Sequence, residues 1–213
     1  MTASDAHAGG LAMAGETEYR VLGQHRDIYI VATDGEDLVL LDQHTAHERI
    51  RFEALQKRAE QRTAESQRLL LPVVTSLPPA QRGLFDEQSE ALALLGYDIE
   101  PFGGDAVRIL AVPALLPPDD PGQALLAILK DVALREEASF RVASARDRLA
   151  ATLACHSAVR AGQRLGAEAM AAIARDLPRT AHPTLCPHGR PTLVRIEQAE
   201  VARWFGRTGW TRR

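Results

Sequence analysis

The sequence is poor in cysteine and aromatic residues, and it has neither a long apolar run nor an excess of positive charge. Only two of its 213 residues are cysteine, so a small fold stapled by several disulfides is excluded. No apolar stretch approaches the roughly 18 residues that a membrane-spanning helix requires, and no secretory leader is recognisable. We therefore expect a soluble, cytoplasmic protein whose thiols serve metal binding or packing.

The charge balance restricts the partners of the chain. Lysine and arginine number 25 against 28 aspartate and glutamate, which gives a formal net charge of -3 and a pI of about 6.2. Nothing global therefore favours nucleic acid through the counterion release that basic stripes produce. If DNA is the substrate, another factor must bring it. The hydrophobic content of 46% suffices for the core of one large or two small domains.

Hydrophobic periodicity and turn residues divide the chain into helices and strands. Residues 1–17 have no periodicity and are expected to form a flexible leader. Residues 38–41 are continuously apolar and predict a buried strand. The expected elements are a hairpin at 28–41, helices at 44–59 and 79–95, an extended segment at 67–74, a hairpin at 97–111, a helix ending near 136, helices at 143–165 and 166–175, a strand at 192–196 and a helix at 197–205.

The densest chemistry lies where the first predicted helix begins. The segment contains Asp42, Gln43, His44, Thr45, Ala46, His47 and Glu48, followed by Glu53. His44 and Glu48 are four residues apart and therefore share one helical face. Two carboxylates and two imidazoles at one junction between strand and helix indicate a metal site. Taken singly, Asp42 can equally be a helix N-cap, and Glu48 and Glu53 can belong to a solvated face.

Both cysteines lie beside histidines. Cys155 precedes His156, and the run Cys186-Pro187-His188-Gly189-Arg190-Pro191 holds a thiol and an imidazole on a loop that its prolines keep out of a helix. A site shared with His44 and Glu48 requires the two ends of the chain to pack together. We therefore expect an α+β fold in which residues 18–74 and 143–213 form one discontinuous subdomain with the metal site, and residues 75–142 form an inserted helix and hairpin subdomain.

These motifs resemble those of the C-terminal endonuclease and dimerisation domain of bacterial MutL mismatch-repair proteins. The segment from Asp42 to Glu53 is similar to that family's acidic signature, and residues 154–161 are similar to its second cysteine motif. The Cys-Pro-His-Gly-Arg-Pro run matches letter for letter, and Phe205-Gly206-Arg207 resembles the terminal Phe-x-Arg. The chain departs from the pattern at Thr45, where alanine is usual, and at His156, where arginine or lysine is common.

The resemblance implies a nicking endonuclease that cleaves one strand of duplex DNA without sequence preference, with divalent metals and with stimulation by the replication sliding clamp. It further implies a homodimer with a dimerisation and a regulatory subdomain, association with the nucleoid, and contact with a MutS-type mismatch-recognition protein through the full-length protein. No ATP chemistry is expected, because no ATPase domain precedes this region. The alternative is a zinc-stabilised dimerisation or interaction module that does not nick DNA.

Phosphodiester hydrolysis of this kind uses two divalent ions about 3.5 to 4 Å apart. We expect Glu48, Cys186 and His188 to hold one ion, and His44 and Cys155 to hold the other, with Cys186 as a candidate bridge. Thiolate and imidazole favour a structural or regulatory Zn²⁺, whereas carboxylate and water favour a catalytic Mn²⁺ or Mg²⁺. Asp42 and Glu48 are the expected catalytic carboxylates. Glu53 is expected to support the helix by pairing with Arg49.

Further segments carry expected contacts. The clamp-binding candidates are Gln67, Leu69, Leu70, Leu71 and Pro72, whose alternative is an ordinary core strand. The candidates for DNA-backbone contact are Arg160, Arg190 and Arg207, with Arg212 and Arg213 at the terminus. Arg190 can equally form a salt bridge that fixes its loop. The expected dimer surface comprises residues 21–22, 28–30 and 204–205 with Trp210, and His47 is expected at the surface.

Overall fold

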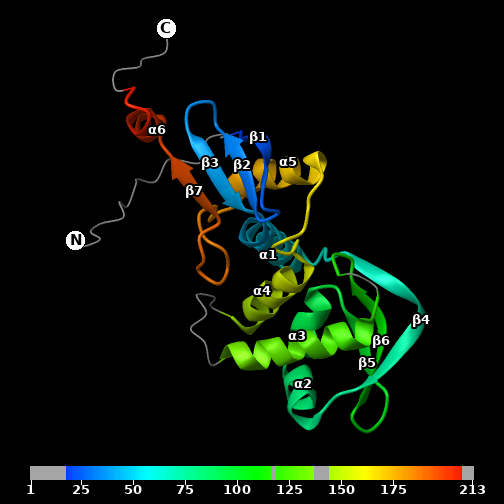
Figure 1. The fold of residues 1–213 in the computed structure, drawn as a ribbon. Helices are drawn as coiled ribbons and strands as arrows, with labels where there is room; N and C mark the ends of the chain where they lie inside the picture. Colours follow the sequence, from blue (N-terminus) through cyan, green and yellow to red (C-terminus); the bar gives the residue numbers. More distant parts are fainter. Residues whose placement is uncertain (1–17, 117–118, 137–143, 208–213) are drawn as a thin grey trace.

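Two antiparallel sheets organise the chain, and helices pack against each of them (Figure 1). The computed structural model describes residues 18–116, 119–136 and 144–207. The strand order is β1-β2-β3-β7 in the first sheet and β4-β6-β5 in the second. The expected α+β class is confirmed. The expected leader at 1–17, together with Trp210, Arg212 and Arg213, lies outside the described residues.

The first sheet joins the two ends of the chain. It contains β1 (Arg20–His25), β2 (Tyr29–Thr33), β3 (Leu38–Asp42) and, from the far end of the sequence, β7 (Leu193–Ile196). Strand β7 pairs antiparallel with β3, so that Leu41 lies opposite Leu193 and Leu38 lies opposite Ile196. The end of β3 and the start of β7 therefore meet, and α1 (Gln43–Gln61) begins at this meeting point.

Strand alternation gives the first sheet one covered and one open face. Helices α1 and α5 (Ala167–Asp176), with the short 3-10 helix η1 (Leu177–Arg179), cover the face of Ile30 and Leu41, both of which have no exposed surface. The opposite face carries Tyr29, Val31, Leu40 and Val194, the last of which is 55% exposed. Ile30 is therefore wrong as a surface residue, because adjacent residues of a strand point to opposite faces.

The second sheet begins earlier in the sequence than expected. Strand β4 (Ser66–Ser76) pairs with β6 (Ala106–Pro113), which also pairs with β5 (Asp98–Pro101). The expected subdomain boundary at residue 74 is therefore wrong, because the whole of β4 belongs to the second sheet. Helices α2 (Pro79–Leu94), α3 (Pro121–Glu136) and α4 (Ala145–Ser157) belong to this half.

Helix α1 connects the two cores. Its first turn contributes Ala46 to the core of the first sheet, whereas Phe52 and Leu55 join the larger core formed with α2, α3, α4 and the second sheet. Figure 1 shows α4 lying beside α1 between the two sheets. The start of α1 is therefore held from both sides, which favours a fixed geometry for its side chains.

Helix α4 is shorter than predicted. The expected helix over 143–165 ends at Ser157, so Cys155 lies in the last turn rather than near the middle. The next residue, Ala158, is extended, with φ -69° and ψ 152°. The carbonyls of Val159 and Arg160 accept hydrogen bonds from side chains of α1 instead of from a continuing helix. Tertiary contacts thus override the local helical pattern.

Strand β1 and helix η1 were not among the expected elements, whereas the other elements agree with the prediction to within a few residues, including α6 (Gln198–Trp204) after β7. Among the helices of the described ranges, none combines the length and apolar character needed to cross a membrane.

Candidate metal centre

Asp42 ends β3 and caps α1. Its Oδ1 accepts the backbone N–H groups of His44 and Thr45, each at 3.0 Å, which satisfies two of the unpaired donors at the start of the helix. The N-cap alternative for Asp42 is therefore confirmed. Asp42 does not belong to either of the two groups of possible metal ligands described below. Its expected catalytic role stays a prediction.

His44 has a fixed ring orientation. Its Nδ1 lies 2.9 Å from the carbonyl oxygen of Val159, which can only accept, so Nδ1 carries the proton and Nε2 faces Glu48 Oε1 at 3.1 Å. Hydrogen bonds to Cys155 and then to Glu48 raise the pKa of His44 to about 10, while burial acts in the opposite direction. A second proton on Nε2 is thus strongly favoured when no metal is bound.

Glu48 is the most buried charge of the centre, with no exposed surface. Its Oε2 lies 3.0 Å from Arg190 Nη2 and 3.5 Å from His188 Nδ1, and its Oε1 lies 3.1 Å from His44 Nε2. Burial alone would raise the pKa of Glu48, but hydrogen bonds with His188, His44 and Cys155 hold it far below its usual value. Glu48 is therefore an ionised, buried carboxylate whose two oxygens face different partners, His44 on one side and His188 with Arg190 on the other.

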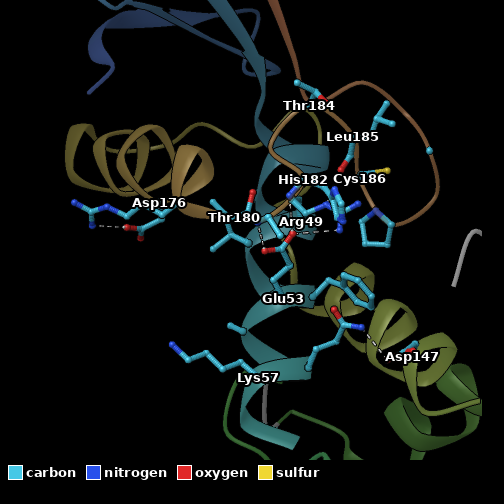
Figure 2. Close-up of a pocket in the computed structure, with 18 of the residues that line it drawn as sticks. Arg49, Glu53, Lys57, Asp147, Asp176, Thr180, His182, Thr184, Leu185 and Cys186 are labelled. Carbon is cyan, nitrogen blue, oxygen red and sulfur yellow. Dashed lines mark hydrogen bonds and ion pairs between the residues drawn. The ribbon is translucent and has the colours of Figure 1, made fainter. Parts of the chain in front are cut away.

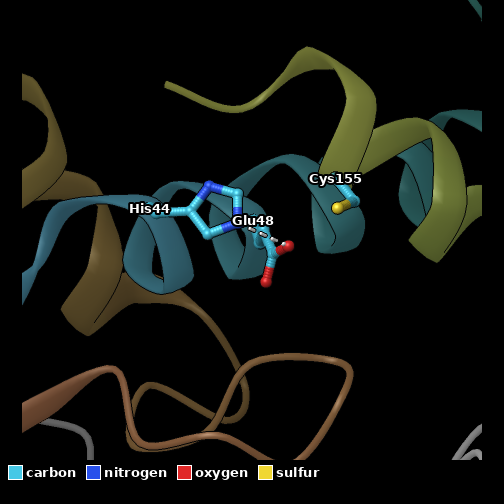
Figure 3. A group of neighbouring side chains, drawn as sticks. All are labelled: His44, Glu48 and Cys155. Carbon is cyan, nitrogen blue, oxygen red and sulfur yellow. Dashed lines mark ion pairs between the residues drawn. The ribbon is translucent and has the colours of Figure 1, made fainter. Parts of the chain in front are cut away.

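The ligand atoms gather in two groups that share Glu48. His44, Glu48 and Cys155 form one group (Figure 3), and Glu48, Cys186 and His188 form the other; within each group the ligand atoms lie within 4.8 Å of one another. Glu48, rather than the expected Cys186, is the residue common to both. This correction has a simple basis, because a carboxylate offers two oxygens in different directions whereas a buried thiol offers one sulfur.

The donor set fits metal ions. Thiolate, imidazole and carboxylate are the usual ligands of Zn²⁺. Burial would raise the pKa of Cys186, but a hydrogen bond with His188 and one with the backbone of Arg190 lower it overall, which favours the thiolate. Cys186 Sγ and His188 Nδ1 are 4.0 Å apart, so small side-chain rotations bring both onto one ion.

Arg49 and Glu53 hold the Cys186 loop against α1. Arg49 Nε donates to the carbonyl of Leu185 at 2.6 Å, and Arg49 Nη1 lies 3.4 Å from Glu53 Oε1, which confirms the expected pairing. Glu53 also accepts the backbone N–H groups of Ala181 at 2.6 Å and His182 at 3.2 Å. Figure 2 shows these groups on the wall of a cavity of about 780 Å³ between α1 and the loop. Glu53 thus supports the loop as well as the helix.

Two residues of the acidic signature have roles that the sequence did not show. Gln43, fully buried, directs its amide nitrogen to the carbonyls of Asp27, Arg160 and Gln163 at 2.8 to 2.9 Å. Thr45 Oγ1 donates to the carbonyl of Pro191 at 2.9 Å. Gln43 therefore fixes the segment after Cys155, and Thr45 fixes the segment after His188. Their position within the signature was the only available sign of this role.

The three candidate DNA-contacting arginines lie in different settings. Arg190 pairs with Glu48, so the salt-bridge alternative is confirmed. Arg160 has an exposed side chain in the segment that follows α4. Arg207 is also exposed but follows α6, beyond the end of the β3–β7 ladder opposite to the start of α1, so the structure does not bring it to the ligand groups.

Two histidines outside the ligand groups connect α4, or the segment that follows it, to another helix. His156 Nε2 lies 2.9 Å from Asp131 Oδ2 and so links α4 to α3. His47 is wrong as a surface residue: its two ring nitrogens face the N–H groups of Val159 and Arg51 at 3.1 and 2.9 Å. Burial and then the charges of Arg51 and His44 lower the pKa of His47 to about 4, which keeps it neutral.

The segment at residues 69–72 projects from the second sheet. The β4–β6 register shifts between Arg68 and Val73, which marks a bulge, and Leu70 and Leu71 are 102% and 79% exposed. The alternative of an ordinary core strand is therefore wrong for these two leucines, although Gln67 still pairs with Val112. The bulge presents apolar side chains to solvent at a point where the ladder is interrupted.

Comparison with known proteins identifies the family of the chain. A family described as "MutL C terminal dimerisation domain" matches residues 22–165. The DNA mismatch repair protein MutL of Koribacter versatilis is 38% identical over 188 residues, which cover 88% of this chain and 29% of that protein. The MutL of Xanthomonas campestris pv. campestris is 38% identical over 201 residues (94% and 31%), and that of Xylella fastidiosa strain M12 is 37% identical over 184 residues (86% and 30%). The chain spans less than a third of the length of these relatives. It belongs to the family of MutL C-terminal dimerisation domains.

Proposed function

We propose that this chain is the nicking endonuclease domain of a DNA mismatch-repair protein and cleaves one strand of duplex DNA without sequence preference. The observation that carries the proposal is the pair of ligand groups on Glu48, built from α1, the end of α4 and the Cys186 loop. The relatives named DNA mismatch repair protein MutL support the process in which the domain would act.

The chain's own residues would bind two metal ions. His44, Cys155 and Glu48 would hold one ion, and Glu48, Cys186 and His188 the other; Zn²⁺ suits the thiolates, and Mn²⁺ or Mg²⁺ would serve catalysis. Bound divalent ions supply a water that is acidic near neutral pH and positive charge for the phosphorane. Asp42, one residue before α1, would orient that water through its second carboxylate oxygen while it holds the helix start.

The sliding clamp is the proposed factor that brings DNA to this acidic chain. The bulge at residues 69–72 offers Leu70 and Leu71 for insertion into an apolar groove, with Gln67 and Pro72 beside them. Tethering of this kind raises the local concentration of DNA without a basic surface on the domain itself. Intrinsic DNA binding, through Arg160 and Arg190, would consequently be weak.

A homodimer is the proposed assembly. The open face of the first sheet carries Tyr29, Val31, Leu40 and Val194 in adjacent strands, and Leu22 is exposed at an irregularity in β1. An apolar sheet face of this kind is typical of obligate interfaces. The first sheet with its helices would then act as a discontinuous dimerisation subdomain, and the second sheet as the regulatory one.

Conversion of supercoiled plasmid to the open circle in Mn²⁺, with and without the clamp, tests the proposal. The parent should nick, and more with the clamp, whereas Glu48→Lys should lose activity because it places a cation on both ligand groups. Glu60→Lys, an exposed position on the same helix, is the matched control and should nick like the parent. A parent that binds metal and dimerises but never nicks would favour the alternative, a zinc-stabilised dimerisation module.

A further inference from the structure

Arg190 lies on the carboxylate that both ligand groups share. Its Nη2 is 3.0 Å from Glu48 Oε2, and this contact joins a side chain that is 53% exposed to one with no exposed surface. His188 Nδ1 lies 3.5 Å from the same oxygen. Arg190 therefore occupies the carboxylate oxygen that faces His188, and this is the direction from which the Glu48, Cys186 and His188 group would take its ion.

The backbone of this loop is fixed independently of the Arg190 side chain. The carbonyl of Arg190 accepts the N–H of Cys186 at 2.8 Å, and the N–H of Gly189 donates to the carbonyl of Cys186 at 2.9 Å. Gly189 has φ +80°, a left-handed conformation that closes this tight turn at no steric cost. The guanidinium, which also hydrogen-bonds the Cys186 side chain, can thus leave Glu48 by rotation of its own side chain while the backbone of Cys186 and His188 keeps its place.

Two cations compete for one oxygen in this arrangement. A metal ion would lie about 2.0–2.2 Å from a carboxylate oxygen, and Arg190 cannot relieve the repulsion by losing its proton, because a guanidinium stays charged in proteins. Its only response is to move. Its half-exposed position leaves solvent as the direction of movement, and a planar fork of donors there matches the geometry of a phosphate.

We propose that Arg190 is a metal-gated phosphate contact: it neutralises Glu48 while the Glu48, Cys186 and His188 group is empty, and it turns outward to a DNA phosphodiester when that group is loaded. This inference rests on the proposed function for the metals and the DNA. It adds an order of events, because the contact to the DNA backbone becomes available only after the ion is in place. An empty centre would then bind DNA less well than a loaded one.

The first test measures Zn²⁺ affinity by competition with a chromogenic chelator. Arg190→Ala should bind Zn²⁺ roughly tenfold more tightly, because it removes a competing charge-assisted hydrogen bond on Glu48. The matched control is Arg179→Ala: that arginine is 70% exposed and its partner Asp176 lies outside the ligand groups, so its affinity should equal the parent's. If Arg190 served only to hold its loop in place, Arg190→Ala would bind Zn²⁺ more weakly than the parent. Weaker Zn²⁺ binding in Arg190→Ala therefore overturns the proposal.

The second test measures binding of a short DNA duplex over a range of salt concentrations, with the chain metal-free and then loaded with Zn²⁺. In the parent and in Arg179→Ala, loading with Zn²⁺ should steepen the slope of log K for DNA binding against log salt concentration by about one, the value for one phosphate contact. In Arg190→Ala, loading should leave this slope unchanged. An equal steepening of the slope in the parent and both variants refutes the proposal that metal binding releases Arg190 to the DNA. Neither measurement requires strand cleavage, so loss of the proposed nicking activity is scored separately on plasmid with Mn²⁺.

Discussion

His44 Nε2 and Glu48 Oε1 lie 3.1 Å apart in a setting that leaves no hydrogen between them if His44 is neutral. The proton of the neutral ring is already committed to Nδ1, which faces the carbonyl of Val159. Two lone pairs at this distance repel each other unless a proton or a metal ion joins them. The hydrogen bond with Cys155 contributes most to the raised pKa of His44, and this contact with Glu48 contributes next.

Gln43 should matter for the site although it offers no ligand. Gln43→Leu removes the shared donor of the carbonyls of Asp27, Arg160 and Gln163 and the acceptor of the Gln24 amide, and each lost hydrogen bond contributes about 0.5–1.5 kcal/mol. We expect the free energy of unfolding to fall by roughly 2–4 kcal/mol in urea titrations. Metal binding by His44 and Cys155 should weaken more than binding by Cys186 and His188, because only the former depend on the segment after α4.

Co²⁺ absorption measured with Cys155→Ser or Cys186→Ser in addition separates the two outcomes for Gln43→Leu, since each group contains one thiolate and only one group then keeps it. The exposed Gln123→Leu on α3 serves as the control and should behave like the parent. Equal loss at both groups would show that Gln43 acts only through global stability.

Glu53 should act on the other group in the same indirect way. Glu53→Ala removes the acceptor of two backbone N–H groups and the partner of Arg49, so the loop that carries Cys186 loses its attachment to α1. We expect a loss of about 2–3 kcal/mol in unfolding free energy and weaker Zn²⁺ binding by Cys186 and His188. Glu60→Ala, one to two turns further along α1 and exposed, should change neither quantity. Unchanged Zn²⁺ affinity in Glu53→Ala would contradict the role of Glu53 in attaching the Cys186 loop to α1.

The sequence predicted the candidate metal ligands better than the residues whose hydrogen bonds hold those ligands in place. His44 and Glu48 share a face by helical spacing, and Cys186 and His188 are two residues apart on a loop, so local pattern suffices to select them. The meeting of these pairs followed only from requiring one common site. The bonds from Gln43 and Thr45 to distant carbonyls were not predictable, because they depend on where the backbone of another segment passes. The same contacts ended α4 early, which helical periodicity alone could not show.

The stability of the metal-free chain should fall as the pH rises above neutrality. The folded-state pKa of His44 is about 10, against 6.5 for an unperturbed histidine side chain, so its stabilising contribution is complete below about pH 6.5 and is lost progressively toward pH 10. Glu48, whose pKa is lowered, contributes in the opposite range, above pH 4.5, and its contribution is lost as the pH falls. Urea unfolding in EDTA should therefore show a maximum between these limits.

The alkaline part of this profile is assignable by substitution. His44→Gln should flatten the decline between pH 7 and pH 10, because the neutral amide does not titrate there. A decline that persists unchanged in His44→Gln would mean that another group is responsible.

The bulge at residues 69–72 should be dispensable for folding. Leu70→Ser with Leu71→Ser should alter the unfolding free energy by no more than about 0.5 kcal/mol, because both side chains are exposed. Clamp binding in surface plasmon resonance should be lost. Leu134→Ser on α3 removes another exposed leucine (60%) and should leave clamp binding intact. Clamp affinity equal to the parent's in the double variant would exclude this segment as the docking site.

The open face of the first sheet should control the oligomeric state. Val194 is 55% exposed and lies on the edge strand β7 in register beside Leu40 and Val31, so Val194→Glu places a carboxylate on this apolar face. In a two-fold interface the change enters twice, and two like charges brought together cost several kcal/mol. We expect the dissociation constant of the dimer to rise by at least about 100-fold in sedimentation velocity. Leu134→Glu should remain dimeric, and a dimeric Val194→Glu of unchanged affinity would place the interface on another surface.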